Sequence, residues 1–257
     1  MATASWRARR LDPDRSLGLR LTVAALGAFL VLVPFSLLTL LVEARWAPLR
    51  ELDHEVAEEL HSQALGSPGF VDATQLWTNV FAPMPLRAAM LGLALWLAYR
   101  RAPRLAAWVV VTMITGGLVG VVLKLLVGRH RPALLDPVSR AAGYSFPSGH
   151  ALNATLAAGI LLLVFLPYVK RMRWLLWAGA LALPLLTGLS RAALGVHWIS
   201  DVIGGWVLGT AIVAATAAAF ATWRSSLGRP HVSMVREGVE PESTDPDSPA
   251  VRRTGGA

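Results

Sequence analysis

The sequence predicts an all-α, polytopic membrane protein, a bundle of about six transmembrane helices. Of its 257 residues, 54% are hydrophobic and only 16% are charged, whereas a soluble domain carries about 25% charged residues. Several apolar runs approach the roughly 20 residues that a helix needs to cross hydrocarbon. Because these runs are long and unbroken, they favour helices over the alternating strands of a membrane barrel.

The first predicted span covers residues 21–42, and five arginines precede it: Arg7, Arg9, Arg10, Arg15 and Arg20. Its length favours a spanning helix over a cleaved signal peptide, which has a shorter apolar core. Five more candidate spans follow, at residues 86–99, 105–127, 151–169, 174–189 and 199–223. The second and fifth of the six are short enough for re-entrant or buried helices, so we extend the second toward Phe81.

Basic residues set the predicted topology. The 24 Lys+Arg against 16 Asp+Glu would suit a nucleic-acid binder, but most basic residues lie in short clusters between the apolar runs, as the positive-inside rule requires. We therefore expect a cell-membrane protein with both termini cytoplasmic, membrane lipids as partners and no nucleic acid. The predicted parts are a cytoplasmic segment (1–20), a six-helix transmembrane domain (21–223) and a disordered cytoplasmic tail (224–257).

The outer loop at residues 43–85 is predicted to contain an amphipathic surface helix, because Leu52, Val56 and Leu60 have helical spacing. His54 and His61 in this loop could share a metal, but a solvated polar face is the favoured interpretation. The chain has no cysteine, which excludes disulfides and thiolate metal sites. We predict no metal and no cofactor.

Two pairs of small residues, Gly116 with Gly120 and Gly205 with Gly209, have the spacing of close helix contacts. They could mark a dimer face, but packing inside one bundle is favoured. A homo-oligomer is possible but not indicated by the sequence.

Polar and ionisable residues are energetically costly near membrane helices, so those at the outer ends of the predicted spans indicate a functional site. Lys124 and Arg131 would share one face if the third helix continued that far, although a snorkelling lysine and a loop arginine are an equal alternative. Pro147-Ser148-Gly149-His150 precedes the fourth span, where Ser148 could cap a helix whose free N–H groups bind an anion. An ordinary capped helix start is again an equal alternative.

The third polar group contains Arg191, His197 and Asp201. His197 and Asp201 are four residues apart, so the carboxylate can hold one ring nitrogen and leave the other free to react. In the predicted topology all three polar groups lie on the outer side of the membrane. Cations and backbone donors directed at one point suit phosphate or another tetrahedral oxyanion.

These residues resemble the signature of the type 2 phosphatidic acid phosphatase (PAP2) superfamily: K-x6-R-P, then P-S-G-H, then S-R-x5-H-x3-D. All eleven fixed positions match, namely Lys124, Arg131, Pro132, Pro147, Ser148, Gly149, His150, Ser190, Arg191, His197 and Asp201. The resemblance implies a metal-independent phosphatase with a phosphohistidine intermediate. In it His197 is the nucleophile, Asp201 orients His197, and His150 is the general acid and base. The phosphate-binding residues it implies are Lys124, Arg131, Ser148, Gly149 and Arg191.

The substrate class implied is a lipid phosphate or pyrophosphate. Undecaprenyl pyrophosphate and other polyprenyl pyrophosphates rank first, and phosphatidic acid or phosphatidylglycerol phosphate comes next. Two alternatives are a non-catalytic phospholipid-binding or transport protein and, more remotely, an enzyme like the vanadium-dependent haloperoxidases, which share the motif but are soluble.

Overall fold

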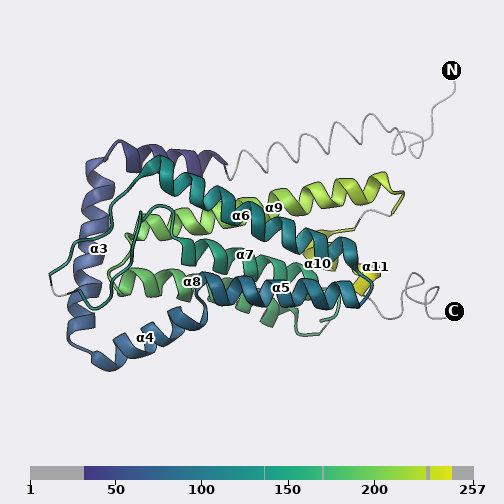
Figure 1. Ribbon diagram of the computed structural model, residues 1–257, viewed down its shortest axis with the longest axis horizontal. Coiled ribbons are helices and arrows are strands. Elements are labelled where there is room, and N and C mark those ends of the chain that lie inside the picture. The colour runs from purple at the N-terminus through teal and green to yellow at the C-terminus, as the bar shows by residue number, and fades with distance from the viewer. Residues whose placement is uncertain (1–31, 136, 170, 230–231, 245–257) are drawn as a thin grey trace, which may run out of the picture.

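A computed structural model describes residues 32–135, 137–169, 171–229 and 232–244 of the chain. All regular structure within these ranges is helical, as predicted. Five long helices run side by side in the bundle of Figure 1: α5 (Pro83–Tyr99), α6 (Pro103–Val127), α7 (Gly149–Phe165), α8 (Arg173–Ala193) and α9 (Ile199–Ser226). Helix α3 (Ala47–Leu65) lies across one end, and α4 (Pro68–Val80) connects it to the bundle.

Within the described ranges, four segments are long and apolar enough to cross a membrane: Pro68–Tyr99, Pro103–Val127, Arg173–Ala193 and Ile199–Ser226. A fifth is counted if the Leu32–Glu43 helix and α3, which are bent by 86°, form one broken span. The predicted fold class is therefore confirmed, but the count of six is not. The first predicted span begins outside the described residues, and α7 has only 17 residues.

Helix α7 occupies the centre of the bundle. Its Leu156 and Ile160 side chains are completely buried. Glycines of the neighbouring helices allow this close packing: a Cβ on Gly116 of α6 would lie 2.2 Å from Leu156, and one on Gly209 of α9 would lie 2.7 Å from Thr155. The glycine pairs thus pack inside the bundle, as the favoured interpretation predicted.

Gly205 of α9 makes the closest approach to the start of α7. A Cβ at this position would lie 2.8 Å from the carbonyl oxygen of Ser148, which is backbone and cannot swing away. We expect Gly205→Ala to lower the free energy of unfolding by about 1–3 kcal/mol. Thermal unfolding in detergent measures this, with Gly179→Ala in α8 as the control because nothing lies within 4 Å of its added Cβ. Equal stability of the two variants would contradict the prediction.

The predicted amphipathic helix corresponds to α3, and the face that it buries in the protein does not include Leu52. Asp53, Ala57 and Ala64 are the buried residues of α3, whereas Leu52 is 48% exposed. The helix contacts α8 and α9 and lies over the end of the bundle (Figure 1). Its inward face therefore brings a carboxylate into the protein, which the spacing of its leucines did not predict.

The tail also differs from the expectation of disorder where the structure describes it. Helix α9 ends at Ser226, and two short helices follow, α10 (Met234–Glu237) and α11 (Pro241–Thr244). Val239 between them is 1% exposed, and Arg229 pairs with Glu240 at 3.2 Å. Residues 245–257 lie outside the described ranges.

Candidate active site

The predicted site residues come together at the end of the bundle that α3 covers (Figure 1). Each comes from a helix end or from a loop at that end. Lys124 is in the last turn of α6, Arg131 in the following loop, Ser148, Gly149 and His150 at the start of α7, Arg191 in the last turn of α8, His197 in the connection before α9, and Asp201 in the first turn of α9. Arg191, His197, Arg131 and Lys124 all lie close enough to His150 to interact with it electrostatically. The structure thus assembles the three polar segments into one site.

Lys124 and Arg131 meet by a different route from the predicted one. Helix α6 ends at Val127 because Gly128 takes a left-handed conformation with φ 59°, which glycine adopts without steric cost. The two cations therefore do not share a helix face. Instead, the loop returns Arg131 to the site, where both cations contact the carbonyl oxygen of Tyr144, at 2.8 Å from Lys124 Nζ and 3.3 Å from Arg131 Nη2.

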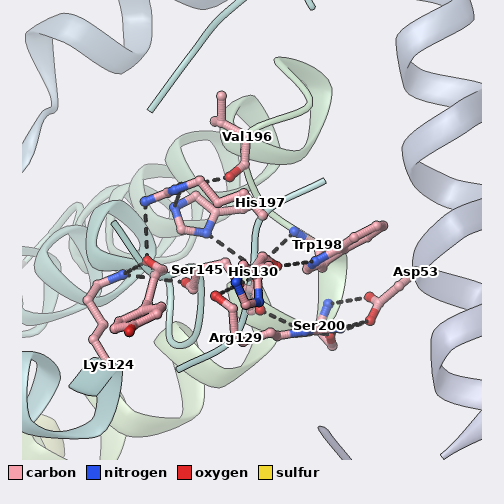
Figure 2. A network of polar contacts seen from close by, with 12 residues as sticks. Asp53, Lys124, Arg129, His130, Ser145, Val196, His197, Trp198 and Ser200 are labelled. Carbon is pink, nitrogen blue, oxygen red and sulfur yellow. Dashed lines mark hydrogen bonds and ion pairs between the residues drawn. The ribbon is translucent and has the colours of Figure 1, made fainter. Parts of the chain in front are cut away.

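His197 is the central residue of the site and is 2% exposed. Figure 2 shows His197 close to the loop that carries Val196. The Nε2 atom of His197 lies 3.0 Å from Arg131 Nη1, and its Nδ1 lies 3.4 Å from Asp201 Oδ2. A guanidinium can only donate hydrogen bonds, so Nε2 accepts and the ring proton lies on Nδ1, facing Asp201. Burial lowers the pKa of His197 to about 4, although Asp201 opposes the shift. The imidazole is therefore neutral at neutral pH, with a lone pair on Nε2.

Arg131 is held in place by backbone carbonyls. Its Nη1 donates to Val196 at 2.7 Å, its Nε donates to Gly143 at 3.0 Å, and its Nη2 donates to Ala142 at 3.1 Å. Burial lowers the pKa of the Arg131 guanidinium, and the Asp201 carboxylate opposes that shift. The cation next to His197 Nε2 is thus preorganised, as a site for oxyanions requires.

Ser148 and Arg191 contribute buried polar groups. Ser148 is the N-cap residue of α7, but its side chain makes no capping hydrogen bond. Its Oγ and the Nε of Arg191 are buried with no hydrogen-bond partner among the described residues. Arg191 Nη1 is fixed by Thr78 Oγ1 of α4 at 3.2 Å. An oxyanion would satisfy both buried groups, since polar groups inside proteins are normally hydrogen-bonded.

Asp201 connects the reactive histidine to the rest of the site. Its Oδ2 accepts a hydrogen bond from the Trp198 backbone N–H at 3.0 Å, and its carbonyl oxygen accepts one from the Ser148 N–H at 2.9 Å. Its Oδ1 lies 2.6 Å from Nη1 of Arg129. Sequence reasoning missed Arg129, and the one available signal was a second arginine two positions before Arg131.

The two histidines of α3 do not meet. The His54 ring packs against the Trp198 ring at 4.7 Å between centroids, and His61 Nε2 lies 2.6 Å from the carbonyl oxygen of Leu135. The described part of the chain contains no group of three or more His, Asp or Glu side chains that could hold a metal ion.

These features define a helical membrane protein in which cations, a helix N-terminus and a buried histidine–aspartate pair meet at one end of the bundle. Residues 105–225 match the model of the PAP2 superfamily, the family that the chain resembles by its signature. The eleven signature residues predicted this result.

Two curated relatives are similar over part of their length. The chain is 36% identical over 98 residues to phosphatidylglycerophosphatase B of Bacillus subtilis (strain 168), covering 37% of this chain and 48% of that protein. It is 33% identical over 124 residues to undecaprenyl-diphosphatase of Sulfolobus acidocaldarius, covering 46% of this chain and 56% of that protein. The chain thus matches about half the length of each relative.

A solved structure shares the fold. The transmembrane PAP2 type phosphatidylglycerolphosphate phosphatase from Bacillus subtilis aligns with a TM-score of 0.65 and 23% sequence identity. The alignment covers 77% of this chain and 97% of that structure. This likeness confirms the helical membrane architecture.

Proposed function

We propose that the chain is a membrane lipid phosphatase that hydrolyses a lipid phosphate or pyrophosphate through a phosphohistidine at His197. One observation carries the proposal: His197 is buried and neutral, with Nδ1 directed at Asp201 and Nε2 directed at Arg131. This arrangement presents a lone pair next to a fixed cation. It is the geometry of a nucleophile oriented by a third group.

In the first step, His197 Nε2 forms a bond to phosphorus as the bond to the leaving oxygen breaks. His150, which takes up a proton when the anionic substrate binds beside it, gives that proton to the leaving oxygen. Arg131 moves its hydrogen bond from Nε2 to a phosphoryl oxygen, and Asp201 stabilises the imidazolium that forms. Lys124, Arg191, Ser148 and the Gly149 N–H bind the other oxygens, where the negative charge is spread in the transition state.

In the second step, His150 takes a proton from water, and the resulting hydroxide attacks phosphorus. The N–P bond breaks, its electron pair returns to His197, and inorganic phosphate leaves. Both steps use only side chains of this chain and water, so the proposal includes no metal and no cofactor.

The lipid class follows from the position of the site and from the relatives. Helix α6 has exposed apolar side chains beside Lys124, with Leu125 at 68% and Leu126 at 72% exposure, which suits an acyl or prenyl tail. One named relative is an undecaprenyl-diphosphatase and the other a phosphatidylglycerophosphatase. We rank polyprenyl pyrophosphates first, and phosphatidic acid and phosphatidylglycerol phosphate next.

The membrane orientation is also part of the proposal. We place the chain in the plasma membrane with both termini in the cytoplasm and the site on the outer side. The basic clusters Arg100, Arg101 and Arg104, and Lys170, Arg171 and Arg173, support this orientation.

Phosphate release by the detergent-purified protein tests the proposed function. We expect release from at least one of undecaprenyl pyrophosphate, phosphatidic acid and phosphatidylglycerol phosphate, with no loss of rate in excess EDTA. Because phosphohistidine is hydrolysed by acid and is stable in alkali, quenching in alkaline SDS after mixing with the ³²P-labelled preferred lipid is expected to trap label on His197, located by mass spectrometry. No release from any of these lipids would contradict the proposal and favour a phospholipid-binding or transport role.

A further inference from the structure

A chain of buried charges joins helix α3 to the aspartate of the site (Figure 2). Arg129 Nη1 lies 2.6 Å from Asp201 Oδ1, and Arg129 Nη2 lies 2.6 Å from Asp53 Oδ2. The side chains of Asp53 and Asp201 are 1% and 0% exposed, and that of Arg129 is 15% exposed. One guanidinium therefore serves two buried carboxylates, of which only Asp201 belongs to the signature.

Asp53 also holds the start of α9, the helix that carries Asp201. Its Oδ1 accepts the backbone N–H of Ser200 at 3.0 Å, and its Oδ2 accepts the Ser200 hydroxyl at 2.7 Å. A carboxylate at a helix N-terminus satisfies free N–H groups and interacts favourably with the helix dipole. Here that carboxylate comes from α3, so α3 fixes the first turn of α9.

These contacts set the orientation of the Asp201 carboxylate. Arg129 holds Oδ1, and the Trp198 backbone N–H holds Oδ2 at 3.0 Å. With both oxygens held, the carboxylate plane is fixed and Oδ2 faces His197 Nδ1 at 3.4 Å. Since the His197 contact is the longest of the three, the shorter contacts determine where the carboxylate lies.

The position of Arg129 separates its role from that of the phosphate-binding cations. Both of its terminal nitrogens are engaged by carboxylates, whereas Nη1 of Arg131 faces His197 Nε2. Arg129, Asp53 and Trp198 line a cavity of about 740 Å³. Neither His197 nor Arg131 is among the residues that line this cavity.

We propose that Asp53 and Arg129 are positioning residues for phosphoryl transfer: they orient Asp201 so that His197 keeps its proton on Nδ1 and its lone pair on Nε2. The inference rests on the proposed function, because it assigns His197 as the nucleophile. Without Arg129, two buried carboxylates would face each other without their shared counterion. Repulsion between them, or protonation of one, would release Asp201 from its orientation.

Steady-state kinetics of the full-length protein in detergent test this role, with the lipid that the wild type hydrolyses fastest. We expect Arg129→Gln to lower kcat at least about tenfold with little change in KM, because the substrate does not contact Arg129. Arg140→Gln is the matched control, since Arg140 is an exposed arginine of the same loop. A kcat of Arg129→Gln within about twofold of this control would overturn the inference.

A charge-compensating double variant separates positioning from simple support of the fold. Asp53→Asn combined with Arg129→Gln removes one negative and one positive charge, so Asp201 no longer faces an uncompensated carboxylate. We expect the double variant to have a higher kcat than Arg129→Gln alone. A further loss of kcat in the double variant, or a raised KM with unchanged kcat in Arg129→Gln, would overturn the inference.

The ¹⁵N chemical shifts of His197 provide a readout that needs no turnover, with His197→Gln used to assign them. We expect the Nδ1–H tautomer in the wild type and a mixture of tautomers in Arg129→Gln, or in Asp53→Asn if the arginine variant does not fold. Unchanged shifts in a folded variant would overturn the inference. An inactive wild type with these shift changes would instead overturn the proposed function alone.

Discussion

Replacement of His197 by alanine is expected to reduce phosphate release at least about 10⁴-fold, because the variant has no atom that can form the N–P bond. The fold should survive the change. His197 lies in the short connection between α8 and α9, and its side-chain contacts are with Arg131 and Asp201. Initial rates of phosphate release, together with the amount of ³²P trapped on the protein, measure the effect.

His61→Ala is the matched control for this experiment. His61 belongs to α3, where its ring contacts the carbonyl oxygen of Leu135, and it has no place in the proposed reaction. Phosphate release by His197→Ala at a rate close to that of His61→Ala would rule out His197 as the nucleophile. Retained binding of inorganic phosphate in His197→Ala would show that the rest of the pocket is intact.

The site could be predicted from the sequence because its parts lie at the ends of apolar spans. Helices that cross a membrane bring alternate connections to the same side, so Lys124, His150 and His197 had to meet at one end of the bundle once the spans were assigned. The signature spacings then named the reactive groups. The path of the chain from Lys124 to Arg131 was not predicted. The two residues were expected on one helix face, but Gly128 ends α6 before Arg131.

The support of Asp201 could not be predicted in the same way. Arg129 and Asp53 are 76 residues apart in the sequence, and nothing in either local pattern indicates a partner. In α3 the spacing of apolar residues predicted an amphipathic surface helix and did not indicate that the helix would bury Asp53, which pairs with Arg129 and accepts the Ser200 backbone N–H. The ion pair with Arg129 and the contact with the start of α9 thus accompany the burial of this face of α3.

The count of six spans could not be confirmed, because helix length alone does not identify a membrane span in this fold. Predictions of spans assume that each helix faces lipid along the whole hydrocarbon thickness. Helix α7 is surrounded by α5, α6, α8 and α9, so its 17 residues satisfy their backbone internally and need not match the full thickness. Conversely, α4 and α5 together extend over 32 residues, which is longer than the hydrocarbon thickness requires.

Replacement of His150 by glutamine should separate the two steps of the reaction. His150 is the second residue of α7, and Arg191, Arg131 and His197 are its electrostatic neighbours. As general acid and base it is expected to contribute about 10²–10⁴-fold to kcat. A lipid phosphomonoester such as phosphatidic acid has a poor leaving group and needs the proton that His150 gives, so the variant should be slow in both steps with this substrate.

With p-nitrophenyl phosphate the leaving group needs little protonation, so phosphorylation of His197 should survive while hydrolysis of the phosphohistidine loses its base. We expect His150→Gln to release a burst of p-nitrophenol that approaches one equivalent per protein and then to turn over slowly. Stopped-flow absorbance measures the burst, and His130→Gln, an exposed histidine of the loop between α6 and α7, is the control. An equal slowing of both substrates without a burst would mean that His150 binds phosphate and transfers no proton. A burst would place the proton transfer on His150, because only the loss of a base lets the phosphoenzyme accumulate when its formation is fast.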